Sequence, residues 1–280
     1  MQVGSGVVFP SMSGDYVLGS QADELARLEA QSAAIEQPTR LVLQAAGIGS
    51  GMHVLDLGSG LGHVSQLVAS LVGPEGSVVG VEQSPELLQA AERRRTDAGL
   101  DRVSFVQGDV RAFDAGRTFD AVVGRLILFH LADPVAVVRH HLGTLRPGGT
   151  VAMVDFDIGA ARVEPRVPAA DVIPWIEAAF SAAGAHPRIG TRLARILDEA
   201  GLEQVESYGF QRYYAPGDRR GPRLVAGVVR SLAPTMVSNG IATEEELDLP
   251  TLEQRLYDQL IENDAVLLPP TVVGAWGRRG

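Results

Sequence analysis

A short apolar segment that runs into alternating glycines constrains this chain most. Residues 54–57 read Val-Leu-Asp-Leu, and glycines follow at positions 58, 60 and 62 before a helical pattern begins. The apolar run is typical of a strand buried on both faces, and glycine lets the backbone approach a ligand without a Cβ clash. A helix that begins directly after such a turn directs backbone N–H groups toward the ligand. The segment therefore predicts a strand, a ligand-binding turn and a helix, in that order.

The spacing of the glycines separates two classes of ligand. Dinucleotide-binding turns read G-x-G-x-x-G, which would require a glycine at position 63, where this chain has a histidine. The sequence instead reads G-x-G-x-G and ends at Gly62. A nicotinamide-dependent dehydrogenase is disfavoured for this reason.

Charge and composition narrow the class of partner. The chain has 280 residues, a net charge of −10 and no cysteine. Binding of a nucleic-acid polymer requires a positive surface, so we expect no nucleic acid as a partner. Without cysteine there is no disulfide framework, thiolate zinc site or cysteine nucleophile, and no other spacing indicates a metal. No apolar run reaches membrane-spanning length and the start lacks a signal-peptide pattern, so a cytoplasmic protein without a membrane partner is expected.

Strand and helix patterns alternate from the glycine turn to about residue 155. Strands are expected at 77–82, 103–106, 119–123 and 151–154. The pairs Ser84-Pro85 and Asp133-Pro134 each place an N-cap residue before a proline at the first helical position. This alternation predicts an α/β fold with a doubly wound parallel sheet, whose ligands bind beyond the carboxyl ends of the strands. The residues expected at that edge are Gly58, Glu82, Asp109, Arg125 and Asp155.

The glycine segment closely resembles the first motif of class I S-adenosylmethionine (SAM)-dependent methyltransferases. Later segments resemble the strand motifs of this family in order: 79–82 (VGVE), 106–110 (VQGDV), 119–123 (FDAVV) and 145–149 (LRPGG). The subgroup that it resembles most is that of the ubiquinone/menaquinone-biosynthesis-like small-molecule methyltransferases. The resemblance implies a Rossmann-like seven-stranded methyltransferase sheet with helical lid insertions, SAM as the cofactor, and transfer of its methyl group to a small molecule.

The resemblance also implies which residues hold the cofactor. Glu82 would accept hydrogen bonds from both ribose hydroxyls, and its structural alternative is a cap for the next helix. Asp109 would lie beside the adenine amino group with the Val110 backbone nearby, and its alternative is a turn-forming role. The other cofactor-binding candidates are Tyr16, Asp56, Gly58, Ser59, Gly60, Gly62, Gln83, Gly108 and Arg125.

Three of these candidates have further explanations. Tyr16 could fold over the cofactor or be exposed on a flexible arm. Asp56 could orient the glycine loop or reach the methionine ammonium through water. Arg125 could pair with the SAM carboxylate, or it could anchor Asp120 or Asp133.

Methyl transfer from a sulfonium requires mainly alignment and exclusion of water, and a base only when the acceptor must lose a proton. His130 follows the fourth strand, and its ordinary pKa of about 6.5 suits such a base. Asp155 is the second candidate. Either residue could instead be structural, His130 by hydrogen-bonding a loop carbonyl and Asp155 by capping local structure. The helix after Asp133-Pro134 is expected to turn Val135, Val138, Leu142 and Leu145 inward. His140 and His141 fall on this helix and are expected at the surface.

The ends of the chain extend beyond the matched segment, which covers residues 54–154. We expect an N-terminal arm and helical lid at 1–47, the SAM-binding core at 48–157, and lid insertions with the last part of the sheet at 158–280. Separate helices are expected at 21–36 and from Pro38. Capping boxes that begin at Thr243 and Thr251 predict two later helix starts.

The acceptor and the atom that is methylated are not determined by the sequence, and a homodimer is possible. A second function also fits the motifs: a SAM-binding protein could use the same pocket for a rearrangement or for regulation. Only an analysis of products separates the two functions.

Overall fold

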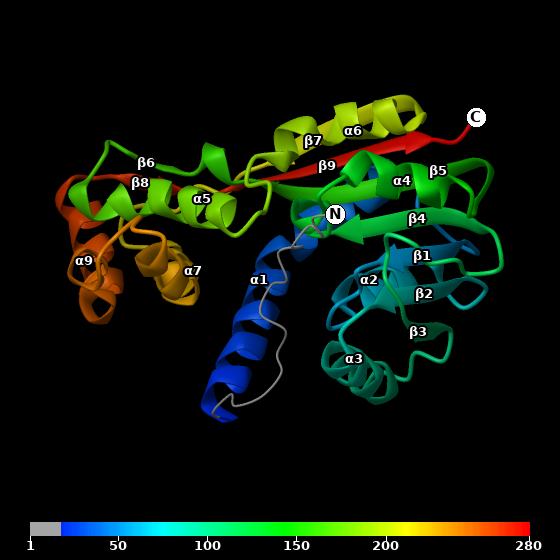
Figure 1. Cartoon of the computed structure of the whole chain (residues 1–280), viewed down its shortest axis with the longest axis horizontal. Coiled ribbons are helices and arrows are strands. Elements are labelled where there is room, and N and C mark those ends of the chain that lie inside the picture. Colours follow the sequence, from blue (N-terminus) through cyan, green and yellow to red (C-terminus); the bar gives the residue numbers. More distant parts are fainter. Residues whose placement is uncertain (1–17) are drawn as a thin grey trace, which may run out of the picture. The chain divides into compact units, whose positions relative to one another are not determined.

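The computed structural model of the chain describes residues 18–280, and these form two compact units (Figure 1). The first, the sheet unit, consists of Ile35–Asp157, Arg188–Phe210 and Val272–Gly280. The second, the helical unit, consists of residues 18–34 with Ile158–Pro187 and Gln211–Thr271. Each unit therefore combines segments that are far apart in the sequence.

The sheet unit is built on seven strands in the order β3-β2-β1-β4-β5-β9-β7. Their bounds are β1 His53–Leu57, β2 Ser77–Glu82, β3 Val103–Gln107, β4 Phe119–Arg125, β5 Leu145–Asp157, β7 Glu203–Phe210 and β9 Thr271–Arg278. Strands β1 to β5 pair in parallel, and β7 runs antiparallel to β9. The expected Rossmann-like sheet of seven strands is thus confirmed.

Helices flank these strands. Their bounds are α1 Leu18–Ala45, α2 His63–Val72, α3 Pro85–Asp97, α4 Pro134–Leu142 and α6 Leu193–Ala200. Helix α2 packs against β1 and β2, α3 against β2 and β3, and α6 against β5, β7 and α4. The core between helices and strands is apolar, with Val42, Val54, Val68 and Trp276 among its buried members. This burial holds the carboxyl ends of β1, β2, β4 and β5 in a fixed arrangement.

The N-terminal helix differs from the expected pair of helices. The sequence predicts a break between 21–36 and Pro38, whereas α1 continues through Pro38. A proline inside a helix removes one backbone hydrogen bond. The turn that follows remains helical because the Thr39 hydroxyl donates to the Ile35 carbonyl at 2.7 Å and because Val42 is fully buried in the core. Tertiary packing therefore outweighs the local signal for a helix start.

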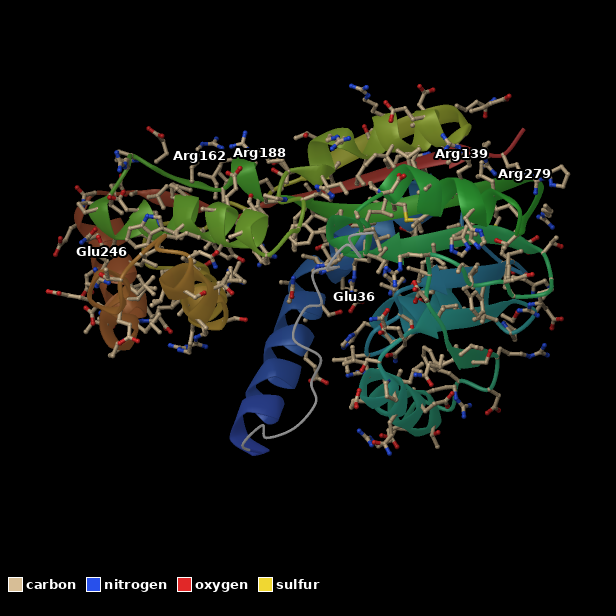
Figure 2. The ribbon with its side chains drawn as sticks, viewed as in Figure 1. Glu36, Arg139, Arg162, Arg188, Glu246 and Arg279 are labelled. Carbon is tan, nitrogen blue, oxygen red and sulfur yellow. The ribbon has the colours of Figure 1, made fainter. Side chains whose placement is uncertain are left out.

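Two arginines connect α4 to neighbouring backbone (Figure 2). Arg139 Nη2 donates to the Glu199 carbonyl of α6 at 2.6 Å. Arg279, which follows β9, donates through Nη1 to the Leu142 carbonyl at 2.7 Å and to the Leu145 carbonyl. The last carbonyls of a helix lack donors within the helix, so Arg279 satisfies the end of α4 and fixes it beside the sheet.

The helical unit has its own small sheet. Its elements are α5 Val172–Ala182, α7 Arg220–Ser238, α8 Glu244–Leu247, α9 Leu249–Glu262 and the antiparallel strands β6 Arg162–Glu164 and β8 Val266–Leu268. Helix α7 packs against α5, α8 and α9. Within the described part of the chain, no helix is both long and apolar enough to cross a membrane.

One of the two expected capping boxes is present. The Thr243 hydroxyl accepts from the Glu246 N–H at 3.2 Å, and the Glu246 carboxylate accepts from the Thr243 N–H at 2.7 Å. The box expected from Thr251 is wrong, because α9 already begins at Leu249 and the Thr251 hydroxyl donates to Asp248. A Pro at the first turn and Asp248 in the left-handed region set this helix start instead.

Candidate functional site

The glycine loop lies at the carboxyl end of β1. Gly58, Gly60 and Gly62 have φ of +67°, +53° and +79°, a region that glycine adopts far more readily than other residues. An added Cβ at Gly58 would lie 2.7 Å from Ile127, and one at Gly62 would lie 2.8 Å from Phe105. An added Cβ at Gly60 would meet nothing within 4 Å. The outer two glycines therefore pack the loop against the sheet unit, while the middle one borders open space.

Glu82 ends β2 and binds this loop directly. Its Oε2 accepts from the Gly60 N–H at 3.0 Å, and its Oε1 accepts from the Gln83 and Ser84 N–H groups, both at 2.9 Å. The side chain that caps α3 is Ser84, whose hydroxyl accepts from the Leu87 N–H at 3.2 Å. Glu82 thus joins the glycine loop to the start of α3 through charge-assisted hydrogen bonds.

Asp56 lies within β1, just before the loop, and is only 1% exposed. Its Oδ2 accepts from the Ser65 hydroxyl at 2.6 Å. Its Oδ1 and the hydroxyl of Ser59 are buried without a hydrogen-bond partner among the described residues. Burial raises the pKa of Asp56 to about 7, although the Ser65 bond and the charge of Arg125 oppose this. Buried polar atoms without partners are unfavourable, and both atoms are suited to a ligand or an ordered water.

Arg125 ends β4 and contacts α1. Its Nη1 lies 3.4 Å from the Thr39 hydroxyl, and burial lowers its pKa. The two acids considered as its anchors serve elsewhere, since Asp120 pairs with Arg146 and Asp133 caps α4. Arg125 therefore links this edge of the sheet to the N-terminal helix.

Asp109 lies in the loop after β3, next to a crowded glycine. An added Cβ at Gly108 would lie 2.7 Å from Phe113, so the backbone passes close to that ring. Asp109 Oδ1 accepts from the Arg111 N–H at 2.9 Å, and the Arg111 guanidinium binds both carboxylate oxygens. These hydrogen bonds lower the pKa of Asp109, so the carboxylate is charged at neutral pH.

His130 is the last residue of a 3-10 turn, η1 Leu128–His130, that follows β4. The residue is exposed, and its ring makes an edge contact with the Phe129 ring at 4.9 Å between centroids. Neighbouring protein atoms remove part of the water around the imidazole, and this partial desolvation lowers its pKa. The ring is therefore neutral at pH 7 and able to accept a proton.

Asp155, near the end of β5, accepts a hydrogen bond from this turn. It is 1% exposed, and its carboxylate accepts from the Phe129 N–H at 3.2 Å and the Phe156 N–H at 3.3 Å. Burial raises the pKa of Asp155 to about 7 against the effect of these backbone hydrogen bonds. The buried carboxylate of Asp155 thus bonds the backbone of the turn that ends at His130.

Leu126, directly after β4, has a left-handed backbone conformation that the sequence did not indicate. It has φ of +56°, which costs a non-glycine residue about 1–2 kcal/mol, and its N–H donates to the Val154 carbonyl at 2.8 Å. Strained backbone of this kind concentrates at functional sites. The sequence gives no signal for this conformation, because a leucine directly after a buried strand predicts that the strand continues.

The prediction that His141 lies at the surface is wrong, whereas His140 is exposed as expected. His141 is fully buried. The sequence pattern was phased on Val135, Val138 and Leu142, but the buried residues of α4 are Pro134, Val137, Val138 and His141.

Two helix hydroxyls that contact candidate residues, those of Thr39 and Ser65, were not predicted either. Tyr16 lies outside the described residues. No group of three or more His, Asp or Glu side chains in the described part of the chain is placed to hold a metal ion.

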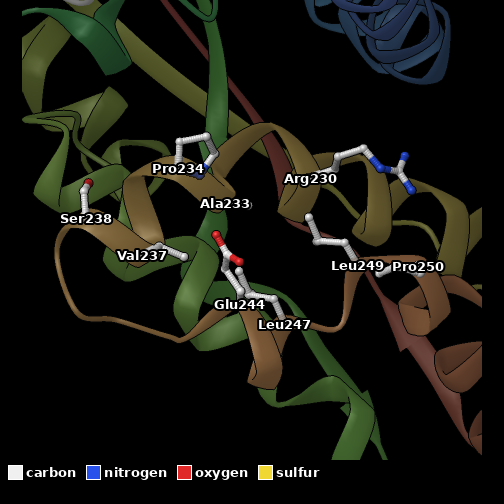
Figure 3. A pocket seen from close by; sticks show the side chains of 9 residues that line it. All are labelled: Arg230, Ala233, Pro234, Val237, Ser238, Glu244, Leu247, Leu249 and Pro250. Carbon is white, nitrogen blue, oxygen red and sulfur yellow. The ribbon is translucent and has the colours of Figure 1, made fainter.

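The helical unit contains a hollow that is separate from these residues (Figure 3). Its volume is about 610 Å³, and helices α7 and α8 and the start of α9 form its walls. The lining residues are Arg230, Ala233, Pro234, Val237, Ser238, Glu244, Leu247, Leu249 and Pro250. The walls are largely apolar, and Arg230 and Glu244 are their two charged side chains.

Comparison with known proteins identifies the family. A family model described as a methyltransferase domain matches residues 48–201. The arsenite methyltransferase of Halobacterium salinarum is 30% identical over 195 residues, which cover 69% of this chain and 48% of the relative. The ubiquinone/menaquinone biosynthesis C-methyltransferase UbiE of Hahella chejuensis is 30% identical over 119 residues, or 42% of this chain and 48% of the relative. The chain thus spans about half the length of these curated relatives.

A solved structure shares the fold. Phosphoethanolamine N-methyltransferase 2 of Haemonchus contortus, in complex with phosphomonomethylethanolamine and S-adenosylhomocysteine, aligns with a TM-score of 0.56 and 18% identity. The alignment covers 87% of this chain and 53% of that protein. Because the methyltransferase model matches more than half of the 280 residues, the chain belongs to the class I SAM-dependent methyltransferase family.

Proposed function

We propose that this protein transfers a methyl group from SAM to a small organic acceptor. The observation that carries the proposal is the glycine loop, where Gly60 borders open space while its N–H is held by Glu82. An acidic chain favours a small molecule over a nucleic acid.

The residues at the carboxyl ends of the strands fit SAM. Glu82 would hold the ribose, and Asp109 with the Val110 backbone would hold the adenine. The buried free atoms of Asp56 and Ser59 lie beside the glycine loop, where they would accept or donate hydrogen bonds at the methionine end. SAM supplies an electrophilic methyl group on a sulfonium, so no protein nucleophile is required.

The part of the protein in the reaction is to align the acceptor, exclude water and, for an acceptor with an acidic proton, remove that proton. We assign proton removal to His130, because it is exposed, follows β4 and is neutral at pH 7. We assign Asp155 a positioning role, since it is 1% exposed and its carboxylate accepts from the Phe129 N–H of the turn that ends at His130. The acceptor is proposed to be a metabolite or natural product of the cytoplasm.

Binding and turnover test the proposal in sequence. Calorimetry should give micromolar affinity for SAM and S-adenosylhomocysteine and much weaker binding of NAD. Incubation with methyl-deuterated SAM and a panel of metabolites, followed by mass spectrometry, should then reveal one labelled product together with S-adenosylhomocysteine. NAD binding as tight as that of SAM would contradict the cofactor assignment. Conversion of an acceptor without label and without S-adenosylhomocysteine would indicate a rearrangement instead of methyl transfer.

A further inference from the structure

His141 makes a buried hydrogen bond to the loop that follows β3. Its Nε2 lies 2.7 Å from the Val110 carbonyl oxygen. A carbonyl oxygen can only accept, so Nε2 carries the hydrogen and donates it. Its Nδ1 is buried without a hydrogen-bond partner among the described residues. Burial lowers the pKa of His141 to about 4, so the ring is neutral at physiological pH.

The peptide unit that His141 binds is held at both ends. Its carbonyl, from Val110, accepts from His141, and its N–H, from Arg111, donates to Asp109 Oδ1 at 2.9 Å. This peptide plane therefore determines the direction of the Arg111 N–H, and with it the position of the Asp109 carboxylate that accepts from that N–H. Within the described part of the chain, the N–H of Val110 donates to no backbone carbonyl.

A second histidine of α4 supports the same loop. His140 Nε2 donates to the Phe113 carbonyl at 3.0 Å, and the two imidazoles contact each other edge to face at 4.9 Å between centroids. Helix α4 thus anchors residues 108–113 at two carbonyls. The inner anchor, to His141, is fully buried, whereas the outer one, to His140, is exposed to competing water.

We propose that His141 is a positioning residue for the nucleobase of the cofactor. Its Nε2–H fixes the Val110–Arg111 peptide and so orients the Asp109 carboxylate and the Val110 N–H toward a purine with a 6-amino group. A carboxylate accepts from the amino group of adenine but repels the 6-oxo group of hypoxanthine. His141 therefore supports the discrimination between these bases as well as affinity. This inference rests on the proposed function, since it requires SAM at this site.

Three substitutions separate the hydrogen bond from packing. His141→Gln retains a neutral donor with a reach similar to that of Nε2. His141→Asn is polar but too short to reach the Val110 carbonyl, and His141→Leu is apolar. Val138→Ala is the matched control, because it truncates another fully buried residue of α4 whose side chain has no polar atom to bond the loop.

The measurements are dissociation constants for S-adenosylhomocysteine and S-inosylhomocysteine, its 6-oxo analogue, at pH 7.5, well above the pKa of about 4 for His141. We expect His141→Gln to stay within threefold of the unaltered protein (roughly 0.7 kcal/mol or less). His141→Asn and His141→Leu should lower the affinity for S-adenosylhomocysteine at least tenfold (about 1.4 kcal/mol) and reduce the preference for adenine over hypoxanthine. Val138→Ala should lower thermal stability but leave that preference unchanged.

The outcomes distinguish the proposed function from the proposed role of His141. An unaltered protein that binds no S-adenosylhomocysteine would contradict the proposed function, and the inference with it. Binding by the unaltered protein with an equal base preference in all His141 variants would overturn the inference alone. Equal losses in His141→Gln and His141→Leu would do the same, since they would assign the effect to packing.

Discussion

Replacement of Gly60 by alanine gives the sharpest test of the site. The alanine must adopt a φ near +53°, which costs about 1–2 kcal/mol for a residue with a Cβ. The new methyl group meets no atom of the protein within 4 Å, so it adds no packing penalty. Gly99 offers a matched control, because it has φ of +63° and equally open surroundings but lies after α3, away from the loop.

The structure sets the size of the expected effects. Both variants should lose about 1–2 kcal/mol of unfolding free energy, a shift of a few degrees in Tm. In Gly60→Ala the methyl also occupies the open space beside the loop backbone. A ligand at a hydrogen-bond distance of about 2.9 Å from that backbone would have to withdraw, since carbon atoms pack at about 3.5–4.0 Å. A loss of one good hydrogen bond, about 1.5 kcal/mol, already weakens binding about tenfold.

Differential scanning calorimetry and titration with SAM would measure both quantities on the same samples. We expect similar Tm values for the two variants, an affinity at least tenfold weaker for Gly60→Ala, and an unchanged affinity for Gly99→Ala. Equal affinities in both variants would refute the reasoning, because the open space at Gly60 would then not be where the cofactor binds.

Three further predictions concern the acids and the candidate base. Glu82→Ala removes the acceptor of three backbone N–H groups. It should lower the affinity for SAM at least tenfold while the fold is retained. An unchanged dissociation constant in a SAM titration would mean that Glu82 only stabilises the loop. His130→Ala should lower kcat at least a hundredfold while SAM affinity stays within a few-fold, and His130→Gln should not restore it; near-normal turnover of the glutamine variant would make His130 structural. The folded-state pKa of Asp155, about 7, exceeds its unfolded value of about 3.9, so the folded protein holds a proton that the unfolded chain has released between these pH values. The free energy of unfolding should therefore fall as pH rises from 4 to 7, and this carboxyl contributes up to about 4 kcal/mol of that fall. Asp155→Asn should reduce this pH dependence in urea titrations. An unchanged pH dependence in the variant would show that Asp155 ionises with an ordinary pKa.

The placement of the site could be predicted because its signals are local in sequence. A strand that ends in glycines, a strand that ends in Glu82 and a helix opened by Ser84-Pro85 each specify their own short segment. Parallel alternation then brings the strand ends to one edge. The loop contact between Glu82 and Gly60 follows from this arrangement, although the two residues are far apart in the chain.

The contacts made by helix side chains could not be predicted in the same way. They depend on the rotation of each helix about its axis, and α4 shows how small an error matters. Phasing on Val135 instead of Pro134 moves His141 from the core to the surface, and its bond to Val110 is then lost. The contact of Thr39 is hidden for a related reason, because Pro38 favours a helix start in the sequence but lies inside α1 in the structure.

Burial also separates the two residues that the sequence left as alternative bases. An acid at the end of β5 and a histidine after β4 both suit proton transfer by residue type, and the sequence places both at the same edge. In the structure the carboxylate of Asp155 accepts from the Phe129 N–H beneath the turn, whereas His130 is exposed at its end. An acceptor that gave its proton to Asp155 would have to reach a carboxylate that is 1% exposed and already accepts a hydrogen bond from this turn. Variants of either residue should therefore change the pH profile of turnover in different ways.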